Sequence, residues 1–193
     1  MTETATAPST REWEGVTIPT PGSFALDPQH THVGFVAKHM MVTKVRGTFP
    51  EVEGTVVLAE DPTQSTVDVT IKTATVHTGA NDRDNHLRSA DFFDVENFPE
   101  ITFRSTAIRH LGGGEFTVAG DLTIRGTTKP VQLAVVFDGV GINPWGTEVA
   151  GVSARTEVDR EQWGLTWNAA LETGGVLVGR KVVLEIEAEA KRV

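Results

Sequence analysis

The sequence predicts an all-β protein built from antiparallel strands, and three observations support this. Apolar and polar residues alternate with a period of two over most of the chain from Phe24 onward. Segments rich in Gly, Pro, Asn and Asp separate the alternating stretches at regular intervals, as in a meander of strands joined by turns. Only residues 79–99 form a long break in the alternation. Such a pattern closes into a barrel or folds into a sandwich.

The first 22 residues are rich in Thr, Ala, Glu and Pro and show no such alternation. We expect residues 1–22 to be a largely disordered extension and residues 23–193 to form the folded domain. Within the extension, Trp13, Val16 and Ile18 are the side chains expected to hold part of it against the domain.

Four later segments show the alternation most clearly, with one apolar face and one polar face each. They are residues 65–73, 115–126, 130–139 and 181–190. Two segments, residues 65–78 and 131–142, are longer than an average strand, which suits the tall and tilted wall of a barrel. The apolar faces carry mostly medium-sized side chains, with few large ones. This favours an open lumen, although a sandwich core has a similar pattern.

The break at residues 79–99 predicts a short helix from Asp82 to Ala90, with Asn81 as its N-cap. Asp84 and Arg88 are four residues apart, as are Asp82 and His86, so these pairs are expected to neutralise each other on an exposed face. Phe92 and Phe93 follow the helix and are expected to plug the mouth of a cavity. The segment is therefore interpreted as a polar lid that carries aromatic plugs. A second break, residues 159–164, predicts a single helical turn.

Composition excludes several classes of function. The chain has 193 residues, a net charge of −9 and a pI of about 5.1. Its Lys and Arg residues are scattered along the sequence, which argues against nucleic acid and against an anionic membrane surface as partners. The sequence contains no cysteine, which excludes disulfides and thiolate chemistry. It contains neither a secretory signal nor an apolar run long enough to span a bilayer, so a cytoplasmic location without stable membrane insertion is expected.

Six histidines are the main candidates for chemistry. His30 and His32 share one strand face, but no third ligand stands out, so no metal site is predicted. His39 shares parity with Val33 and Phe35 and is a candidate to contact the polar head of a ligand, with a hydrogen-bonded core histidine as the alternative. No nucleophile elbow and no phosphate-binding loop leading into a helix occur. No cofactor is predicted.

Several motifs occur together and in one order. They are FALDPQHTHVGFVAKHM, KVRGTFPEVEGTV, RDNHLRSADFFDVENFPEITFRST, VAGDLTIRGTTKPV and REQWGL. With these motifs the chain resembles the YceI-like family of polyisoprenoid-binding, or lipid-binding, domains over residues 23–191. The resemblance implies a lipocalin-like, extended eight-stranded antiparallel β-barrel with a short helical insertion near its mouth. It also implies a lumen that holds a long-chain apolar molecule, such as a polyisoprenoid, an isoprenoid quinone or a fatty amide. A homodimer is compatible with it.

The expected function is non-enzymatic binding, storage or transport of this ligand, with an opening of the lumen beside Phe92. The predicted ligand-binding residues are Phe35, His39, Phe49, Val67, Val69, Ile71, Phe92, Phe93, Phe103, Leu122, Ile124, Leu133, Val135, Phe137 and Trp163. Two alternatives remain. One is an enzyme acting on an isoprenoid or quinone with His39 or His86 as general base. The other is a structural β-domain with a filled core that binds a protein partner.

Overall fold

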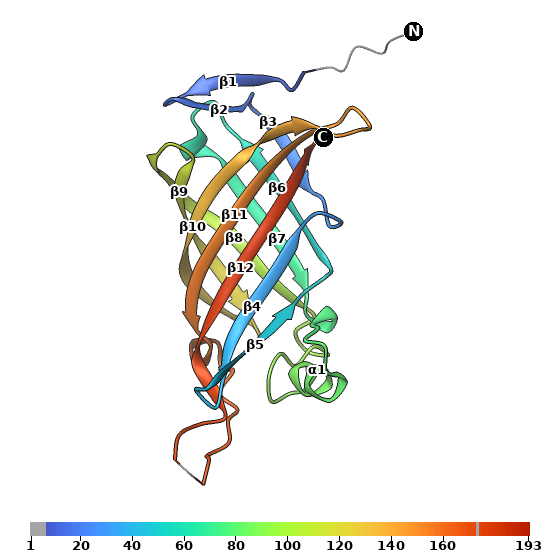
Figure 1. Cartoon of the computed structure of the whole chain (residues 1–193), viewed down its shortest axis with the longest axis vertical. Helices are drawn as coiled ribbons and strands as arrows, with labels where there is room; N and C mark the ends of the chain where they lie inside the picture. Colours follow the sequence, from blue (N-terminus) through green and yellow to red (C-terminus); the bar gives the residue numbers. More distant parts are fainter. Residues whose placement is uncertain (1–6, 173) are drawn as a thin grey trace.

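The computed structural model describes residues 7–172 and 174–193, and it shows an elongated barrel of long, tilted strands (Figure 1). The barrel strands are β3 (Gly22–Leu26), β4 (His32–His39), β5 (Thr43–Thr48), β6 (Val52–Leu58), β7 (Thr66–Lys72), β8 (Glu100–Gly112), β9 (Glu115–Ile124), β10 (Thr127–Ile142), β11 (Glu148–Asp159) and β12 (Val178–Arg192). The predicted all-β, lipocalin-like eight-stranded barrel is confirmed.

Two of the eight strand positions are divided into two segments each. The final strand β12 pairs with β3 through Ala190–Arg192 and with β4 through residues 178–187. Likewise β5 pairs with β4, and β6 pairs with β3. Pairing of β12 with β11 closes the ring. One long antiparallel wall therefore surrounds a common interior.

The division between β3 and β4 is stabilised by Asp27, whose side chain is 3% exposed. Its carboxylate accepts hydrogen bonds from His30 Nδ1 at 2.6 Å and from the backbone N–H of Gln29 at 3.1 Å. Lys191 Nζ on β12 lies 2.7 Å from the same carboxylate. The turn is thereby fastened to the strand that both segments share.

The period-two alternation correctly identifies the strand faces. Val67, Val69 and Ile71 on β7 pack against the core, as do Val118, Leu122 and Ile124 on β9. Bulges interrupt the register at four places, between Ser105 and Ala107, His110 and Gly112, Phe137 and Gly139, and Val178 and Val182. None of these falls inside the alternating parts of β7 and β9.

Short helical segments lie between the strands. They are η1 (Pro62–Gln64), η2 (Thr73–Thr75), α1 (Asn81–Arg88) and η3 (Arg160–Trp163). The predicted helix and the predicted helical turn are both confirmed, with α1 beginning one residue earlier than expected. The helix N-cap is Ala80 and not Asn81, and it makes no side-chain cap hydrogen bond.

The segment before the barrel forms a hairpin of β1 (Thr10–Trp13) and β2 (Val16–Pro19). Regular structure here differs from the expected disorder of residues 1–22, and residues 1–6 lie outside the described residues. Glu14 and Gly15 both have positive φ, so they form the tight turn that lets the two strands pair. The hairpin lies across one end of the barrel, whereas α1 lies at the other end (Figure 1).

Candidate functional site

An apolar cavity of about 160 Å³ lies inside the barrel at the end covered by the β1–β2 hairpin. Its walls come from the hairpin and from the barrel strands around it. The lining residues are Ile18, Pro19, Phe24, Leu26, Val56, Leu58, Pro62, Ser65, Val67, Ile108, Phe116, Val118, Val135, Phe137, Ala150, Val152, Ala188 and Ala190. Alanines on β11 and β12 leave room where larger side chains would fill the lumen.

The lining of this cavity is almost entirely hydrocarbon. Its one hydroxyl side chain is Ser65, whose Oγ accepts a hydrogen bond from the backbone N–H of Ala59 at 3.0 Å. No ionisable side chain is among the described residues that line it. A ligand in the cavity would therefore be recognised by burial of apolar surface, because no charged group is present to select a polar head.

The β1–β2 hairpin forms the roof of the cavity. Ile18 is 4% exposed and faces the lumen beside Pro19. The ring of Trp13 lies 4.6 Å from that of His110 and 6.0 Å from that of Phe116, with the second pair stacked. These contacts place an aromatic side chain of the hairpin against the barrel rim.

Polar contacts add to these aromatic contacts, and no strand pairing joins the hairpin to the barrel within residues 7–172 and 174–193. The backbone N–H of Ser9 donates to Glu148 Oε2 at 2.7 Å, and Arg11 Nη2 donates to the carbonyl oxygen of Ala59 at 3.3 Å. Glu148 is 7% exposed and also accepts from Arg192 Nη2 at 2.7 Å. The roof is thus a separate element that can move without breaking a barrel ladder.

The opposite end of the barrel is filled by the protein's own side chains. Trp163 is 2% exposed, and its Nε1 donates to the carbonyl oxygen of Leu122 at 3.0 Å. The Phe93 ring packs edge-on against that of Phe49 with 5.4 Å between centroids. We expected an opening beside Phe92, but this side chain is 7% exposed and lies against the rings of His86 and Trp167. The apolar cavity lies at the other end.

Some of the predicted ligand-binding residues line the cavity, where Val67 and Val135 also pack against the core, and most of the others lie in the packed core alone. Val67, Val135 and Phe137 line the cavity. The packed core contains Phe35, Phe49, Val69, Ile71, Phe92, Phe93, Phe103, Leu122, Ile124, Leu133 and Trp163. His39 lies at the end of β4, away from the cavity. The period-two pattern indicates which side chains point inward but not their height along the barrel, so it could not separate these two groups.

Sequence reasoning missed the roof residue Ile18 and the small side chains Ala150, Ala188 and Ala190. A signal for Ile18 was present, because Trp13, Val16 and Ile18 were expected to contact the domain. Alanines on inward positions of two neighbouring strands were a second available signal for a locally wide lumen.

The helix α1 is held by a buried carboxylate and not by the expected ion pairs. Asp84 is 2% exposed and accepts hydrogen bonds from the backbone N–H and the hydroxyl of Thr78, at 2.8 and 2.5 Å. Burial acts to raise the pKa of Asp84, but these hydrogen bonds, together with His77, lower it more, so the net pKa lies below its usual value. The Asp84–Arg88 pairing is wrong, because Arg88 donates instead to the carbonyl oxygens of Ala74 and Val76.

The Asp82–His86 pairing is also wrong, since His86 Nε2 lies 2.8 Å from Asp91 Oδ2. The imidazole packs edge-on against Trp167 with 4.5 Å between ring centroids. His86 therefore lies at the filled end of the barrel, and it is not among the residues that line the apolar cavity.

Asp27, His30 and Glu189 form a group whose possible ligand atoms lie within 4.8 Å of one another. Lys191 Nζ lies 2.7 Å from the Asp27 carboxylate, and a metal ion would have to displace this ammonium group. His30 and His32 do not converge, because His32 Nδ1 faces Thr48 Oγ1 at 3.5 Å. The arrangement is that of an internal ion pair and not of a metal centre.

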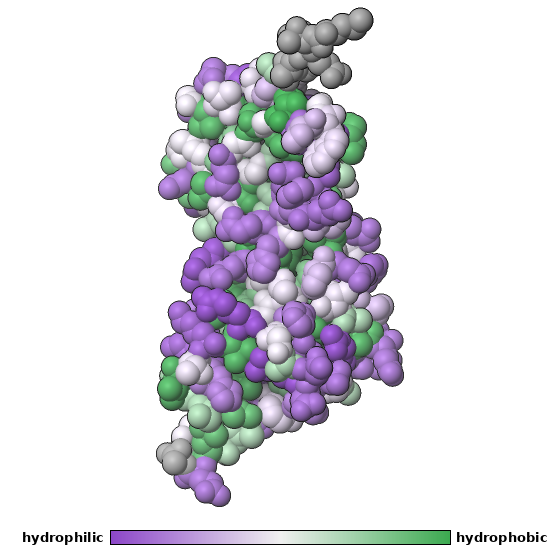
Figure 2. Space-filling model, turned by 45° about the vertical axis from the view of Figure 1, so that its right-hand side comes forward, coloured by the Kyte–Doolittle hydropathy of each residue, from purple (hydrophilic) through white to green (hydrophobic). Residues whose placement is uncertain are grey.

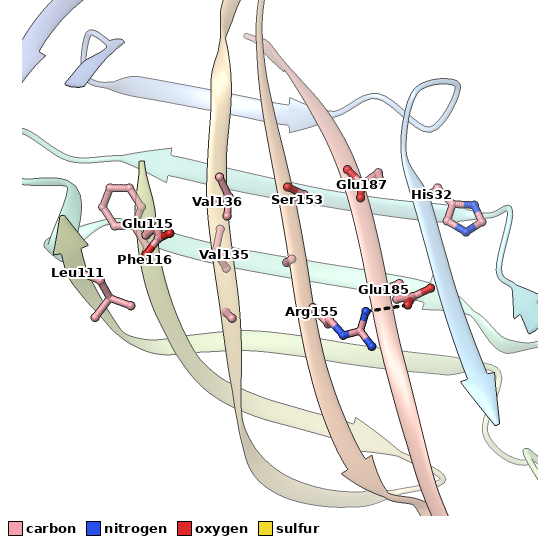
Figure 3. Close-up of a pocket in the computed structure, with 12 residues that line it drawn as sticks. His32, Leu111, Glu115, Phe116, Val135, Val136, Ser153, Arg155, Glu185 and Glu187 are labelled. Carbon is pink, nitrogen blue, oxygen red and sulfur yellow. Dashed lines mark hydrogen bonds and ion pairs between the residues drawn. The ribbon is translucent and has the colours of Figure 1, made fainter. Parts of the chain in front are cut away.

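A wider hollow of about 530 Å³ lies elsewhere on the barrel wall, and Figure 3 shows the side chains along it. Charges of both signs line it, including Arg155 and Glu185, whose side chains form a hydrogen bond of 3.1 Å. Leu111 and Val136 supply part of its apolar surface. Because an apolar chain in this hollow would desolvate charged groups, it suits such a ligand less well than the cavity does.

Within the described residues, no helix is long and apolar enough to cross a membrane.

Comparison with protein families matches residues 24–190 to the YceI-like domain. Two proteins of Staphylococcus aureus are similar in sequence over 172 residues, covering 86% of this chain and 96% of each relative. UPF0312 protein SAB2563 of strain bovine RF122 / ET3-1 is 38% identical, and UPF0312 protein SA2479 of strain N315 is 39% identical.

Three solved structures share the fold. A Campylobacter jejuni YCEI protein has a TM-score of 0.69 and 28% identity, covering 81% of this chain and 90% of its own. Burkholderia cenocepacia BcnA has a TM-score of 0.75 and 22% identity, covering 85% and 98%. A polyisoprenoid binding domain from Saccharophagus degradans, implicated in plant cell wall breakdown, has a TM-score of 0.66 and 14% identity, covering 90% and 100%.

Proposed function

The chain belongs to the YceI-like family, and on that premise we propose that it binds a long-chain apolar ligand inside its barrel without transforming it. The observation that carries the proposal is the roofed cavity, whose described lining has no ionisable side chain. A polyisoprenoid, an isoprenoid quinone and a fatty amide all have the hydrocarbon tail that such a lining would hold. The ligand would be stored or carried, and no catalytic group is assigned.

Burial of hydrocarbon supplies the binding energy in this proposal. Apolar surface removed from water contributes about 25 cal/mol per Å², so an isoprene-sized unit contributes roughly 2–3 kcal/mol before ordering costs are subtracted. A chain that buries several such units binds tightly without any polar contact. This agrees with a site whose one hydroxyl side chain, Ser65, already hydrogen bonds to the backbone.

The size of the cavity indicates which part of the ligand it holds. A cavity of 160 Å³ is close to the roughly 150 Å³ that admits a benzene-sized guest. It therefore takes the end of a chain, and a longer chain needs further room. Val67 and Val135 line the cavity and, like Leu133 on the same wall, are only partly buried. Displacement of the hairpin would open a path for the remainder of the chain.

A relative's description favours isoprenoid over other tails. The domain from Saccharophagus degradans is called polyisoprenoid binding, and it shares this chain's fold at 14% identity. We therefore place a polyisoprenoid or isoprenoid quinone first and a fatty amide second.

The decisive experiment is organic extraction of the purified protein followed by mass spectrometry. The proposal expects a co-purifying molecule with a long hydrocarbon chain. A binding assay then locates the site, with a fluorescent fatty acid as probe and farnesol as competitor. Ala188→Phe places a ring in the cavity and is expected to weaken probe binding about tenfold or more, which corresponds to ~1.4 kcal/mol. The matched control is Ala107→Phe, because Ala107 is exposed on β8 and lines neither hollow.

The two alternatives give different outcomes. An enzyme that uses His39 or His86 would lose turnover of a prenyl or quinone substrate on His→Ala substitution while retaining the ligand. A structural domain would yield no extractable lipid, and its probe binding would not respond to Ala188→Phe. Either result would refute a non-catalytic carrier.

A further inference from the structure

The turn between β4 and β5 places two methionines where the backbone favours glycine. Met40 and Met41 have φ values of 50° and 60°, and the backbone N–H of Val42 donates to the carbonyl oxygen of His39 at 3.0 Å. Positive φ at both central residues is the geometry of a type I′ turn, which strongly prefers Asn-Gly or Gly-Gly. Large side chains at both positions are unfavourable, because the Cβ atom approaches the backbone.

The same turn exposes its apolar side chains. Met40 is 42% exposed, Met41 57% and Val42 79%. Val176 in the neighbouring loop is also exposed, and the Met40 N–H donates to the carbonyl oxygen of Leu177 at 2.8 Å, which connects the turn to that loop. We call Met40, Met41, Val42 and Val176 the apolar tip. The turn lies at the end of the barrel opposite the β1–β2 hairpin, next to the loop that leads into β12 (Figure 1), and Figure 2 shows hydrophobic surface at that end as well as at the hairpin end.

Two lysines flank this turn. Lys38 on β4 is directly opposite Lys44 on β5, and both are exposed. Like charges at directly opposed positions destabilise a strand pair. Among the ion pairs of residues 7–172 and 174–193, none includes either lysine. Nearby Arg180, in contrast, is paired with Asp159 and Glu161.

We propose that the apolar tip, with Lys38 and Lys44 behind it, is a docking surface for an anionic phospholipid bilayer. Met40, Met41 and Val42 enter the boundary between head groups and acyl chains. Lys38 and Lys44 then reach lipid phosphates, with their methylene stems along the apolar layer. An anionic surface offsets the repulsion between the two lysines, and an apolar layer removes the exposed methionines from water. Charge complementarity thus favours a lipid surface that carries negative charge.

The net charge of −9 does not prevent this contact at physiological ionic strength. Charges farther than about 8 Å from the bilayer are largely screened there, so the surface interacts mainly with the tip and its two lysines. Lys and Arg residues are scattered along the sequence, and pairing of β4 with β5 brings Lys38 and Lys44 together. Docking here is reversible and needs no spanning segment.

The test is flotation of the purified full chain with vesicles of phosphatidylcholine alone and with vesicles that also contain phosphatidylglycerol. The wild-type chain is expected to float with the mixed vesicles and much less with phosphatidylcholine alone. Lys38→Gln/Lys44→Gln is expected to weaken binding to the mixed vesicles by roughly five-fold per lysine. Met40→Asn/Met41→Gly installs the preferred turn pair, so it is expected to raise the melting temperature and abolish flotation.

Two controls separate this inference from other effects. Trp145→Ser removes a side chain that is 79% exposed on a different turn, between β10 and β11, and it should leave flotation unchanged. Ala188→Phe blocks the internal cavity and should also leave flotation unchanged, because docking does not depend on the internal ligand. The proposal is overturned if wild-type chain stays unbound with both vesicle types, or if Met40→Asn/Met41→Gly floats like the wild type.

Discussion

The indole nitrogen of Trp163 donates a hydrogen bond to the carbonyl oxygen of Leu122 over 3.0 Å, and this contact ties η3 to β9 at the filled end of the barrel. The bond links residues that are 41 positions apart in the sequence. Both side chains belong to the packed core and neither lines the apolar cavity. Mutation should therefore separate stability at this end from the ligand binding proposed for the other end.

Trp163→Phe is expected to lower the free energy of unfolding by about 2 kcal/mol, since it leaves the Leu122 carbonyl without its donor and creates a void. Urea denaturation monitored by circular dichroism measures this change. Affinity for the fluorescent fatty acid should stay within experimental error of the wild type. A variant that is fully folded but no longer binds the probe would contradict the proposal that the ligand occupies the cavity at the hairpin end.

Trp13→Ser is expected to loosen the roof, because it removes the aromatic contacts with His110 and Phe116. Release of the fluorescent fatty acid should become several-fold faster, consistent with about 1 kcal/mol lost from an aromatic contact. Stopped-flow displacement by excess farnesol measures this rate. The matched variant Trp145→Ser, on an exposed turn, should release the probe at the wild-type rate, and equal rates for all three proteins would argue against a moving roof.

Gly120→Ala is expected to destabilise the barrel by about 1–3 kcal/mol. A Cβ atom at position 120 would lie 2.6 Å from the carbonyl oxygen of Arg104 and would collide with the Phe103 ring. Thermal unfolding is the measurement. Gly141→Ala is the control, because nothing lies within 4 Å of the added Cβ atom there, and similar melting temperatures for the two variants would refute the close approach of β8 and β9.

The contacts of Asp27 predict that the free energy of unfolding depends on pH in the acid range. The hydrogen bond from His30, followed by Lys191, lowers the pKa of Asp27 from 3.8 to about 2. A group whose pKa is lower in the folded state stabilises the fold above its unfolded pKa, and this contribution is lost as pH falls. The free energy of unfolding of the wild-type protein should therefore fall by on the order of 1–2 kcal/mol between about pH 4 and pH 2 as Asp27 is protonated.

Asp27→Asn should be less stable than the wild type at pH 7, and the difference should shrink as pH falls through this window. Urea midpoints measured at several pH values test the prediction. The control is Asp82→Asn on the exposed surface of α1, which should follow the wild-type pH profile. If the urea midpoints of Asp27→Asn and the wild type differ by the same amount down to pH 2, the lowered pKa of Asp27 is contradicted.

The period of the apolar pattern was sufficient to predict the barrel strands, because side chains on a strand alternate between two environments. The α1 segment was recognised for the complementary reason, that this alternation stops there. The ion pairs on α1 could not be predicted, since i,i+4 spacing does not reveal that Asp84 is buried against Thr78. The β1–β2 hairpin was missed because its Thr- and Pro-rich composition resembles a flexible tail.

The cavity illustrates a second limit. Inward parity holds equally for Val67, which lines the cavity, and Ile71, which is packed in the core. The difference between them is position along the barrel axis, which depends on how far each strand is shifted against its neighbours. That stagger follows from the closed ring of pairings and is not encoded in any single strand.

The closure of the wall by β12 has a consequence for the order of assembly. Phe24 on β3 is the strand partner of Arg192 on β12, so the first barrel strand pairs with the last. During synthesis on the ribosome, β3 and β4 emerge long before the strand they both need, and they must wait with one edge open. Contacts of such long sequence separation fold slowly, so the nascent chain passes through a stage in which its edges can pair with other chains.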